Sequence, residues 1–457
     1  MSMDEKKQAN PSRKTIAGVS AFVFLLYAGF RMAALTKAAF GRFSFMEMLN
    51  YFWWVLRGGT AYHSPDYSMG FLPRALTGQI LSFFTGGALT DRAAAFYMLA
   101  AFVIAYGLFS VVVGILIEKA ARTENYLMAM FPFLFILLPL PVWFRTFLFM
   151  NYDTFMLLFT LLAFLLLLRS KNEKLLWLVP LLSCLGILAN YAYALLFFPL
   201  LFALLYYEYI QSGLKKSGLA RLIVTTGSSA ALGLYMMVAP FYSELMHRIG
   251  LYKYDYDQAI ALLEGRVGRA LDPHELLYIS HTIYGKIPCG DLYTYVPIKM
   301  GEFGAFSPIY GWFQPRYILC AALLCLPVCV FSLLVWRRMA KGEAGFLKRS
   351  PYYLFMLAPL IILPGFAVFS DIDRLVWSAL LTQLLLVIYV FFKKGEDAAF
   401  ERMKEITKRD KLALACIVLF GLAILLPLLV FKDDKLLNPV DVASLEEMAR
   451  RLGVQSQ

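Results

Sequence analysis

The amino-acid sequence predicts an all-helical, polytopic integral membrane protein. Hydrophobic residues make up 60% of the 457-residue chain and charged residues 16%. A soluble domain carries about 25% charged residues, so this composition excludes an ordinary soluble fold. Apolar runs of about 17–25 residues, long enough for a helix to cross a bilayer, recur along the chain. The net charge of +12 comes from basic residues clustered in loops on one membrane side, and we expect no nucleic-acid partner.

The apolar runs predict eleven transmembrane helices. The first, at about residues 15–36, follows a basic N-terminal segment without a small-residue cleavage site, so we expect a retained helix. The other ten are expected at about residues 93–117, 126–142, 153–168, 175–189, 192–210, 222–242, 317–336, 352–370, 375–392 and 412–431. Only a weak break at Asn190 and Tyr191 separates the fifth from the sixth.

The distribution of basic residues indicates that these two helices are separate. With eleven spans, five basic segments all lie on the side of the N-terminus: Lys119 and Arg122, Arg169 to Lys174, Lys215 to Arg221, Arg337 to Arg349, and Lys393 to Lys411. Fusing the fifth and sixth spans would destroy that alternation. We therefore expect one multi-pass domain, residues 1–457, in the inner (cytoplasmic) membrane, with a cytoplasmic N-terminus and an external C-terminal tail, 432–457.

Two long external loops remain. In residues 37–92, the aromatic segment 43–56 is too short for a confident span, and it is expected to lie along the membrane surface, as is the segment after Pro73. The loop of residues 243–316 has mixed charge and many tyrosines. Long loops of this kind are usually functional, so we expect it to fold over the outer membrane face.

The stretch HSPDYSMGFLPRALTG, which begins at His63, is a polar island in the first of these loops. Its turn-forming residues predict a loop up to Gly70, followed by a short helix that carries Arg74. A helix N-terminus beside an arginine attracts a phosphate group, and Asp66 adds a carboxylate. The alternative is a structural turn in which Asp66 caps the helix or pairs with Arg74.

Two further charged clusters are predicted at external ends of spans. One joins Arg145 to Tyr152 and Asp153; the other contains Asp371, Asp373 and Arg374. Asp153 is also explained as a cap of the fourth span, and the second cluster as a local salt-bridged turn. Carboxylates and arginines from distant parts of the chain, gathered under a folded outer loop, favour an anionic lipid-linked substrate and an acid–base step.

This layout resembles the C-type (GT-C) integral-membrane glycosyltransferases, which use polyprenyl-phosphate-linked sugars. The resemblance rests on a long first external loop with an acidic residue, a second acidic residue between spans three and four, and a large loop between spans seven and eight. The segments PDYSMGFLPRALTG, NYDTF and DIDRLVW also look like patterns of uncharacterised bacterial proteins of this type. The paired acidic residues of the first loop and the Trp-Trp-Asp motif of oligosaccharyltransferases are missing, so protein N-glycosylation is not implied.

The resemblance implies an inverting glycosyltransferase that moves a sugar from a polyprenyl phosphate to an acceptor hydroxyl at the outer membrane face. Asp66 is then the general base, and Asp153 orients the acceptor. Arg74, Arg145 and Arg374 hold the phosphate, and the substrate-binding set also contains His63, Tyr152, Asp371 and Asp373. Any divalent cation, Mg²⁺ or Mn²⁺, would bind at Asp66 and Asp153. The acceptor is a glycan, a lipid or a protein.

Two other classes of function stay open. A transporter or flippase for a lipid-linked or anionic substrate would use the same charges, but it predicts ionisable residues near the middle of spans, where most runs are purely apolar. A non-catalytic assembly subunit predicts that no pocket joins the three clusters. A cavity lined by Asp66, Asp153 and Arg374, open to the outside and to lipid, distinguishes the enzyme from both.

Overall fold

The fold is helical apart from one small hairpin in the part of the chain that the structure describes. The computed structural model describes residues 18–23, 60, 62–87, 89–122, 131, 152–271, 273–289, 294–297, 315–362 and 372–394. The all-helical prediction is therefore confirmed for these residues. The hairpin pairs β1 (Lys286–Cys289) with β2 (Thr294–Pro297) in antiparallel register.

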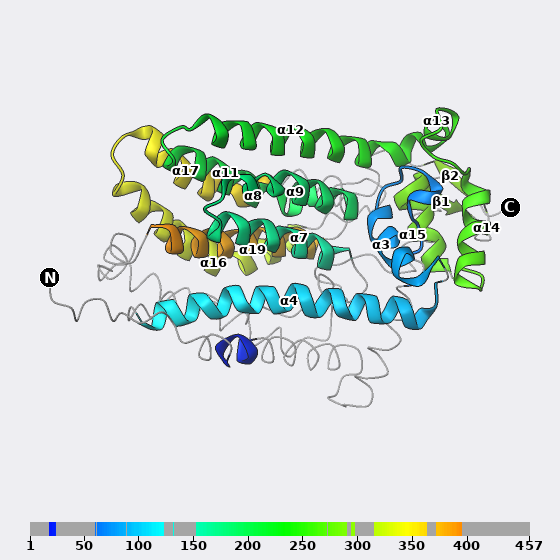
Figure 1. Cartoon of the computed structure of the whole chain (residues 1–457), viewed down its shortest axis with the longest axis horizontal. Coiled ribbons are helices and arrows are strands. Elements are labelled where there is room, and N and C mark those ends of the chain that lie inside the picture. Colours follow the sequence, from blue (N-terminus) through cyan, green and yellow to red (C-terminus); the bar gives the residue numbers. More distant parts are fainter. Residues whose placement is uncertain are drawn as a thin grey trace.

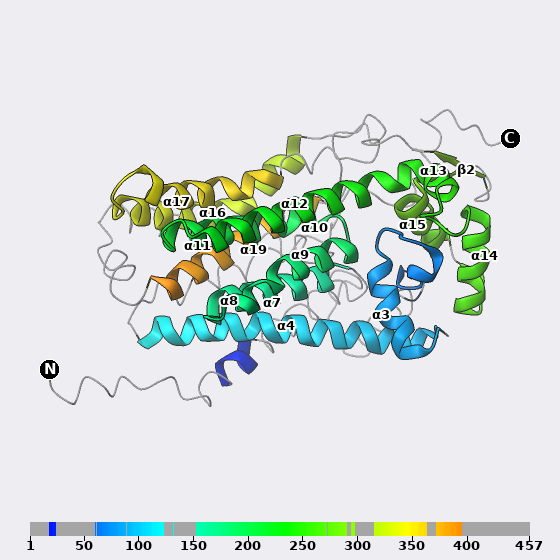
Figure 2. The same ribbon diagram turned by 45° about the horizontal axis from the view of Figure 1, so that its top comes forward.

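Long apolar helices run roughly side by side along the long axis of the molecule (Figure 1). They are α4 (Asp91–Arg122), α7 (Asp153–Arg169), α9 (Leu178–Ala189), α11 (Phe198–Gln211), α12 (Lys216–Val238), α16 (Pro315–Lys341), α17 (Phe346–Leu357) and α19 (Ile372–Lys393). Short helical pieces extend them: α8 (Glu173–Leu176), α10 (Tyr193–Leu196), η3 (Ala239–Tyr242) and η4 (Ala358–Ile362). The rotated view shows α4 along one side of this bundle (Figure 2).

The predicted break between the fifth and sixth spans is confirmed. Asn190 ends α9, and its side-chain oxygen accepts a hydrogen bond from the backbone N–H of Ala192 at 3.0 Å. The chain then reverses its direction, as the contacts with α12 show. Ser183 of α9 contacts Ser229 of α12, whereas Tyr209, near the end of α11, lies against Gly218, near the start of α12. Helix α9 thus runs parallel to α12, and α11 runs antiparallel to it.

The basic segments gather at one end of the bundle. Lys119 of α4 lies over the rings of Phe391 and Phe392 of α19, at 5.4 and 4.9 Å. At the same end, Lys393 forms an ion pair with Glu208 of α11 at 3.5 Å, and Lys394 pairs with Glu343 in the α16–α17 turn. The helix directions therefore agree with the predicted alternation of basic loops, although no membrane is defined by these contacts.

Two helical stretches, Asp91–Ala120 and Lys216–Arg248, are long and apolar enough to cross a membrane, judged by length and composition over the described residues. Within the described residues, the other predicted spans do not meet this criterion of length and composition. Helix α7 has 17 residues and α11 has 14, fewer than the roughly 20 that a perpendicular helix needs. The third and eleventh spans and most of the first lie outside the described residues, as do segment 43–56 and the tail 432–457.

Both predicted external loops fold together at the end of the bundle opposite the basic residues (Figure 1). The first loop contributes η2 (Tyr67–Met69) and α3 (Ala75–Thr85). The second contributes α13 (Ser243–Arg248), α14 (Tyr256–Val267), α15 (Pro273–Tyr284) and the hairpin. We call residues 62–87 and the described residues of 243–297 the cap.

The cap has a hydrophobic core of its own. Met69 and Leu72 from the first loop are buried with Tyr252, Leu263 and Ile279 from the second. A capping box starts α14, because the Asp255 side chain accepts a hydrogen bond from the N–H of Gln258, whose side chain bonds back to Asp255. The described part of the second loop therefore forms short helices that pack on the first loop, and its position over the outer membrane face stays a prediction.

Candidate functional site

The polar stretch that begins at His63 forms the part of the cap nearest the bundle. Its backbone pairs directly with the second loop, since Phe71 N–H donates to the carbonyl of Leu251 at 2.7 Å and Lys253 N–H donates to that of Met69 at 2.9 Å. Gly70 lies between these bonds, with φ 115° and ψ −176°, a conformation open essentially to glycine alone. The glycine thus allows two backbones, far apart in sequence, to meet.

Gly78 has a similar role inside α3. A Cβ atom there would lie 2.0 Å from the carbonyl oxygen of Pro65. Helix α3 therefore packs directly on the backbone that precedes Asp66, which fixes where the carboxylate points.

Asp66 is 4% exposed, and one of its carboxylate oxygens is held firmly. Oδ1 accepts hydrogen bonds from Ser68 N–H at 3.0 Å and from Ser68 Oγ at 2.6 Å, which caps the η2 turn. Oδ1 also forms an ion pair with Arg266 of α14, with Nη1 at 3.1 Å. Within the described residues, the second oxygen, Oδ2, accepts no hydrogen bond. The arrangement fixes the carboxylate through Oδ1 and leaves Oδ2 to accept a proton.

Arg266 joins the second loop to the first through three acceptors. Besides Asp66, it donates from Nη1 to the Ser64 carbonyl at 3.0 Å and from Nη2 to Ser68 Oγ at 2.6 Å. The alternative in which Asp66 pairs with Arg74 is therefore wrong, because the ion pair of Asp66 is with Arg266. An arginine suits this role, since its planar fork serves several acceptors at once.

Arg74 lies immediately before α3 and not within the helix, which corrects the sequence-based prediction. It is the N-cap residue, with φ 65° in the left-handed region. That conformation costs a residue with a side chain about 1–2 kcal/mol. The Arg74 guanidinium carbon lies 5.5 Å from the ring centre of Tyr152 and 5.0 Å from that of Tyr191, and these cation–π contacts help to offset the cost.

His63 is fully buried beside the same aromatic group. Its ring lies 5.0 Å from that of Tyr152, and Nδ1 is 3.0 Å from Thr77 Oγ1 of α3. Tyr152 also donates from its hydroxyl to the carbonyl of Tyr62. The structure therefore brings three predicted site residues, His63, Arg74 and Tyr152, into one cluster.

Asp153 is the first residue of α7 and is buried next to this cluster. The N-cap residue of α7 is Tyr152, and no side chain caps the helix, so the alternative in which Asp153 is the cap is wrong. The helix dipole still stabilises a carboxylate in this first turn. Asp373 and Arg374 lie in the first turn of α19, but their side chains are not among those described. Arg145 and Asp371 lie outside the described residues, so the three-cluster prediction is untested for them.

Sequence reasoning missed Arg266 and Tyr191. Arg266 lies near the end of a helix of mixed charge, where an arginine normally faces solvent, and Tyr191 was noted only as part of a helix break. No local pattern links Asp66 to a residue 200 positions away. The one available signal was the predicted placement of both loops on the same side of the membrane.

The described part of the chain contains no group of three or more His, Cys, Asp or Glu side chains arranged to hold a metal ion. A divalent cation at Asp66 and Asp153 thus remains an expectation. No family model matches the chain, and no curated protein or solved structure shows significant similarity to it. The function must therefore be argued from the site itself.

Proposed function

We propose that this chain is a polytopic membrane glycosyltransferase that transfers a sugar from a polyprenyl phosphate to an acceptor hydroxyl on the outer face of the cytoplasmic membrane. The observation that carries the proposal is the geometry of Asp66, whose Oδ1 is anchored by Ser68 and Arg266 while Oδ2 accepts nothing from the described residues. A general base needs this combination of a fixed position and an available oxygen. The resemblance to GT-C enzymes supplies the reaction.

In the proposed reaction, the oxygen of the acceptor hydroxyl attacks the anomeric carbon, and Oδ2 of Asp66 takes the proton of that hydroxyl. The bond from that carbon to the phosphate oxygen breaks, and polyprenyl phosphate leaves with the bonding electrons. Attack opposite the leaving group inverts the anomeric configuration. Asp153, at the start of α7, orients the acceptor, which is a glycan, a lipid or a protein.

Arg74 is the described residue best suited to the donor phosphate. Its guanidinium carbon lies over the rings of Tyr152 and Tyr191, and its charge lies at the start of α3, where helix amide hydrogens also attract a phosphate group. The planar guanidinium is also the side-chain group whose N–H donors match phosphate oxygens in pairs. Arg145 and Arg374 are proposed to complete the phosphate site, and His63 supports it by packing on Tyr152.

The surface of α3 favours a site at the membrane boundary. Phe83 is 81% exposed and Phe84 is 75% exposed, at the end of the helix. Large exposed aromatic side chains are typical of helices that lie in the lipid interface. A lipid-linked donor would reach Arg74 from this side of the cap.

We expect Arg74→Ala to weaken binding of polyprenyl monophosphate by about 10- to 100-fold, because a charge-assisted contact is worth roughly 1.5–3 kcal/mol. Polyprenyl monophosphate is the product shared by all donors of this class, so the sugar need not be known. Binding to purified protein is measured by calorimetry. Arg92→Ala, which removes an exposed arginine of α4, is the matched control and should bind as the parent does. Equal affinity of Arg74→Ala and the parent would contradict the phosphate role.

The proposed topology places the cap outside the cell and the basic end inside. Cysteine introduced at the exposed position of Asp257 in α14 should react with a membrane-impermeant maleimide added to intact cells. Cysteine at the exposed position of Lys348 in α17 should react only after the cells are opened, with the parent protein as background. The reverse pattern would overturn the topology and the external site together.

A further inference from the structure

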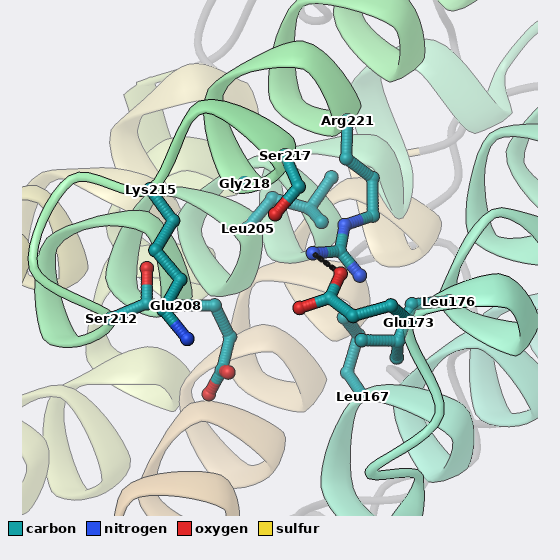
Figure 3. A pocket seen from close by; sticks show the side chains of 10 residues that line it. All are labelled: Leu167, Glu173, Leu176, Leu205, Glu208, Ser212, Lys215, Ser217, Gly218 and Arg221. Atoms are coloured by element: carbon teal, nitrogen blue, oxygen red, sulfur yellow. Dashed lines mark hydrogen bonds and ion pairs between the residues drawn. The ribbon is translucent and has the colours of Figure 1, made fainter.

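A cavity lined by charged and hydroxyl side chains together with leucines lies at the basic end of the bundle, away from the cap. It has a volume of about 70 Å³ and lies between the ends of α7, α8, α11 and α12. Figure 3 shows Lys215 and Arg221 extending toward it from opposite sides, with Ser217 between them. A single water needs about 10–15 Å³ by the same measure, so the cavity has room for a larger group.

Arg221 is the buried charge of this cavity. The residue is 6% exposed, and its Nη2 donates to Glu173 Oε2 at 3.3 Å. The Glu173 side chain is 57% exposed, so solvent screens that ion pair. The buried Nη1 finds no acceptor in the part of the chain that the structure describes. A buried guanidinium N–H without an acceptor is unfavourable, which indicates that the cavity supplies one.

The start of α12 provides further donors. The helix begins at Lys216, and Lys215 at the N-cap position makes no side-chain capping bond. The first N–H groups of a helix have no partner within it, and they form the positive end of the helix dipole. Two residues of this first turn, Ser217 and Gly218, line the cavity. Amide hydrogens at a helix N-terminus are a common binding site for phosphate groups.

The acidic residues that line the cavity have partners already. Glu173 pairs with Arg221, and Glu208 accepts a hydrogen bond from the Tyr389 hydroxyl at 2.7 Å and pairs with Lys393. Lys215 forms no ion pair within the described residues. Among the buried side-chain nitrogen and oxygen atoms of the residues that line the cavity, only Arg221 Nη1 lacks a partner within the described part of the chain.

We propose that this cavity binds a phosphate-type anion, held by Arg221, Lys215 and the first turn of α12. Exposed apolar side chains lie on neighbouring helices, Trp177 beside α8 and Leu219 on α12, so the anion is either a soluble phosphate or the phosphate of a lipid headgroup. The proposal goes beyond the glycosyltransferase reaction, and it does not depend on it. Its test measures binding and not turnover.

The experiment titrates inorganic phosphate, at constant ionic strength, into the purified full-length protein and follows the melting temperature. A second arm uses a short-chain phosphatidylglycerol, with the uncharged short-chain diacylglycerol as control. We expect phosphate, phosphatidylglycerol or both to raise the melting temperature. Stabilisation by the lipid alone identifies the headgroup as the source, and stabilisation by phosphate alone identifies a soluble ligand.

Lys215→Gln, at an exposed position, should lower the apparent affinity about ten-fold, and Arg221→Gln about 10- to 100-fold. Lys348→Gln, which removes an exposed lysine at the same end, should leave it unchanged. If Arg221→Gln does not fold, the apparent affinity of Lys215→Gln alone tests the proposal. No stabilisation of the parent in either arm, or equal losses for Lys215→Gln and Lys348→Gln, would overturn the proposal and leave a water-filled cavity.

Discussion

Asp66→Asn is expected to lower sugar transfer by about 10²–10⁴-fold, while polyprenyl monophosphate still binds. The amide keeps the shape of the side chain, and its oxygen can accept the Ser68 N–H bond that caps η2. Arg266 keeps its bonds to Ser64 and to the Ser68 hydroxyl. The substitution therefore removes the proton acceptor but retains most of the contacts that hold the cap.

The measurement compares turnover and product binding for purified Asp66→Asn and the parent, with a panel of polyprenyl-phosphate sugars as donors. Asp257→Asn, an exposed carboxylate of α14 in the same cap, is the control and should transfer sugar normally. Normal turnover by Asp66→Asn would contradict its role as base. If no donor in the panel is consumed by the parent while a lipid-linked substrate is moved across vesicles, the transporter or flippase alternative replaces the enzyme.

The positions of several helices along the chain could be predicted from local sequence. Apolar runs located α4, α7 and α12, because long apolar segments without charges predict helices and not strands. Even the short break at Asn190 was predictable, since a fused helix would have placed the basic segments on both sides. Helix ends were less accurate. For example, α12 begins at Lys216 and not at about residue 222, because lysine is a good helix former.

The geometry of the candidate site could be predicted only in part. Turn-forming residues located the loop of Asp66 and the short helix that follows it. The left-handed conformation of Arg74 was not predictable, because it depends on contacts with Tyr152 and Tyr191, which come from distant helices. The same reason applies to Arg266, whose ion pair with Asp66 depends on how the two predicted external loops pack.

Gly70→Ala is expected to release the second loop from the first and to destabilise the cap by about 2–6 kcal/mol. Two costs add. A residue with a side chain at φ 115° and ψ −176° is strained by about 1–3 kcal/mol. The new Cβ would also lie 2.4 Å from the carbonyl oxygen of Leu251, and overpacking of this kind costs about 1–3 kcal/mol. Because the contacts are backbone atoms, they cannot move aside without breaking the two hydrogen bonds that flank Gly70.

Hydrogen exchange in residues 249–271 measures this release, together with the melting temperature and turnover. We expect faster exchange in that segment and a loss of activity, since Arg266 would no longer hold Oδ1 of Asp66. Gly250→Ala is the matched control: Gly250 also has positive φ, at 79°, but a Cβ there meets nothing within 4 Å. It should show only the strain of the left-handed conformation, about 1–2 kcal/mol, with the cap still docked.

Equal exchange in the two variants would mean that the close contact at Gly70 does not hold the loops together. An undocked cap with full activity would remove the second loop, and Arg266 with it, from the proposed site.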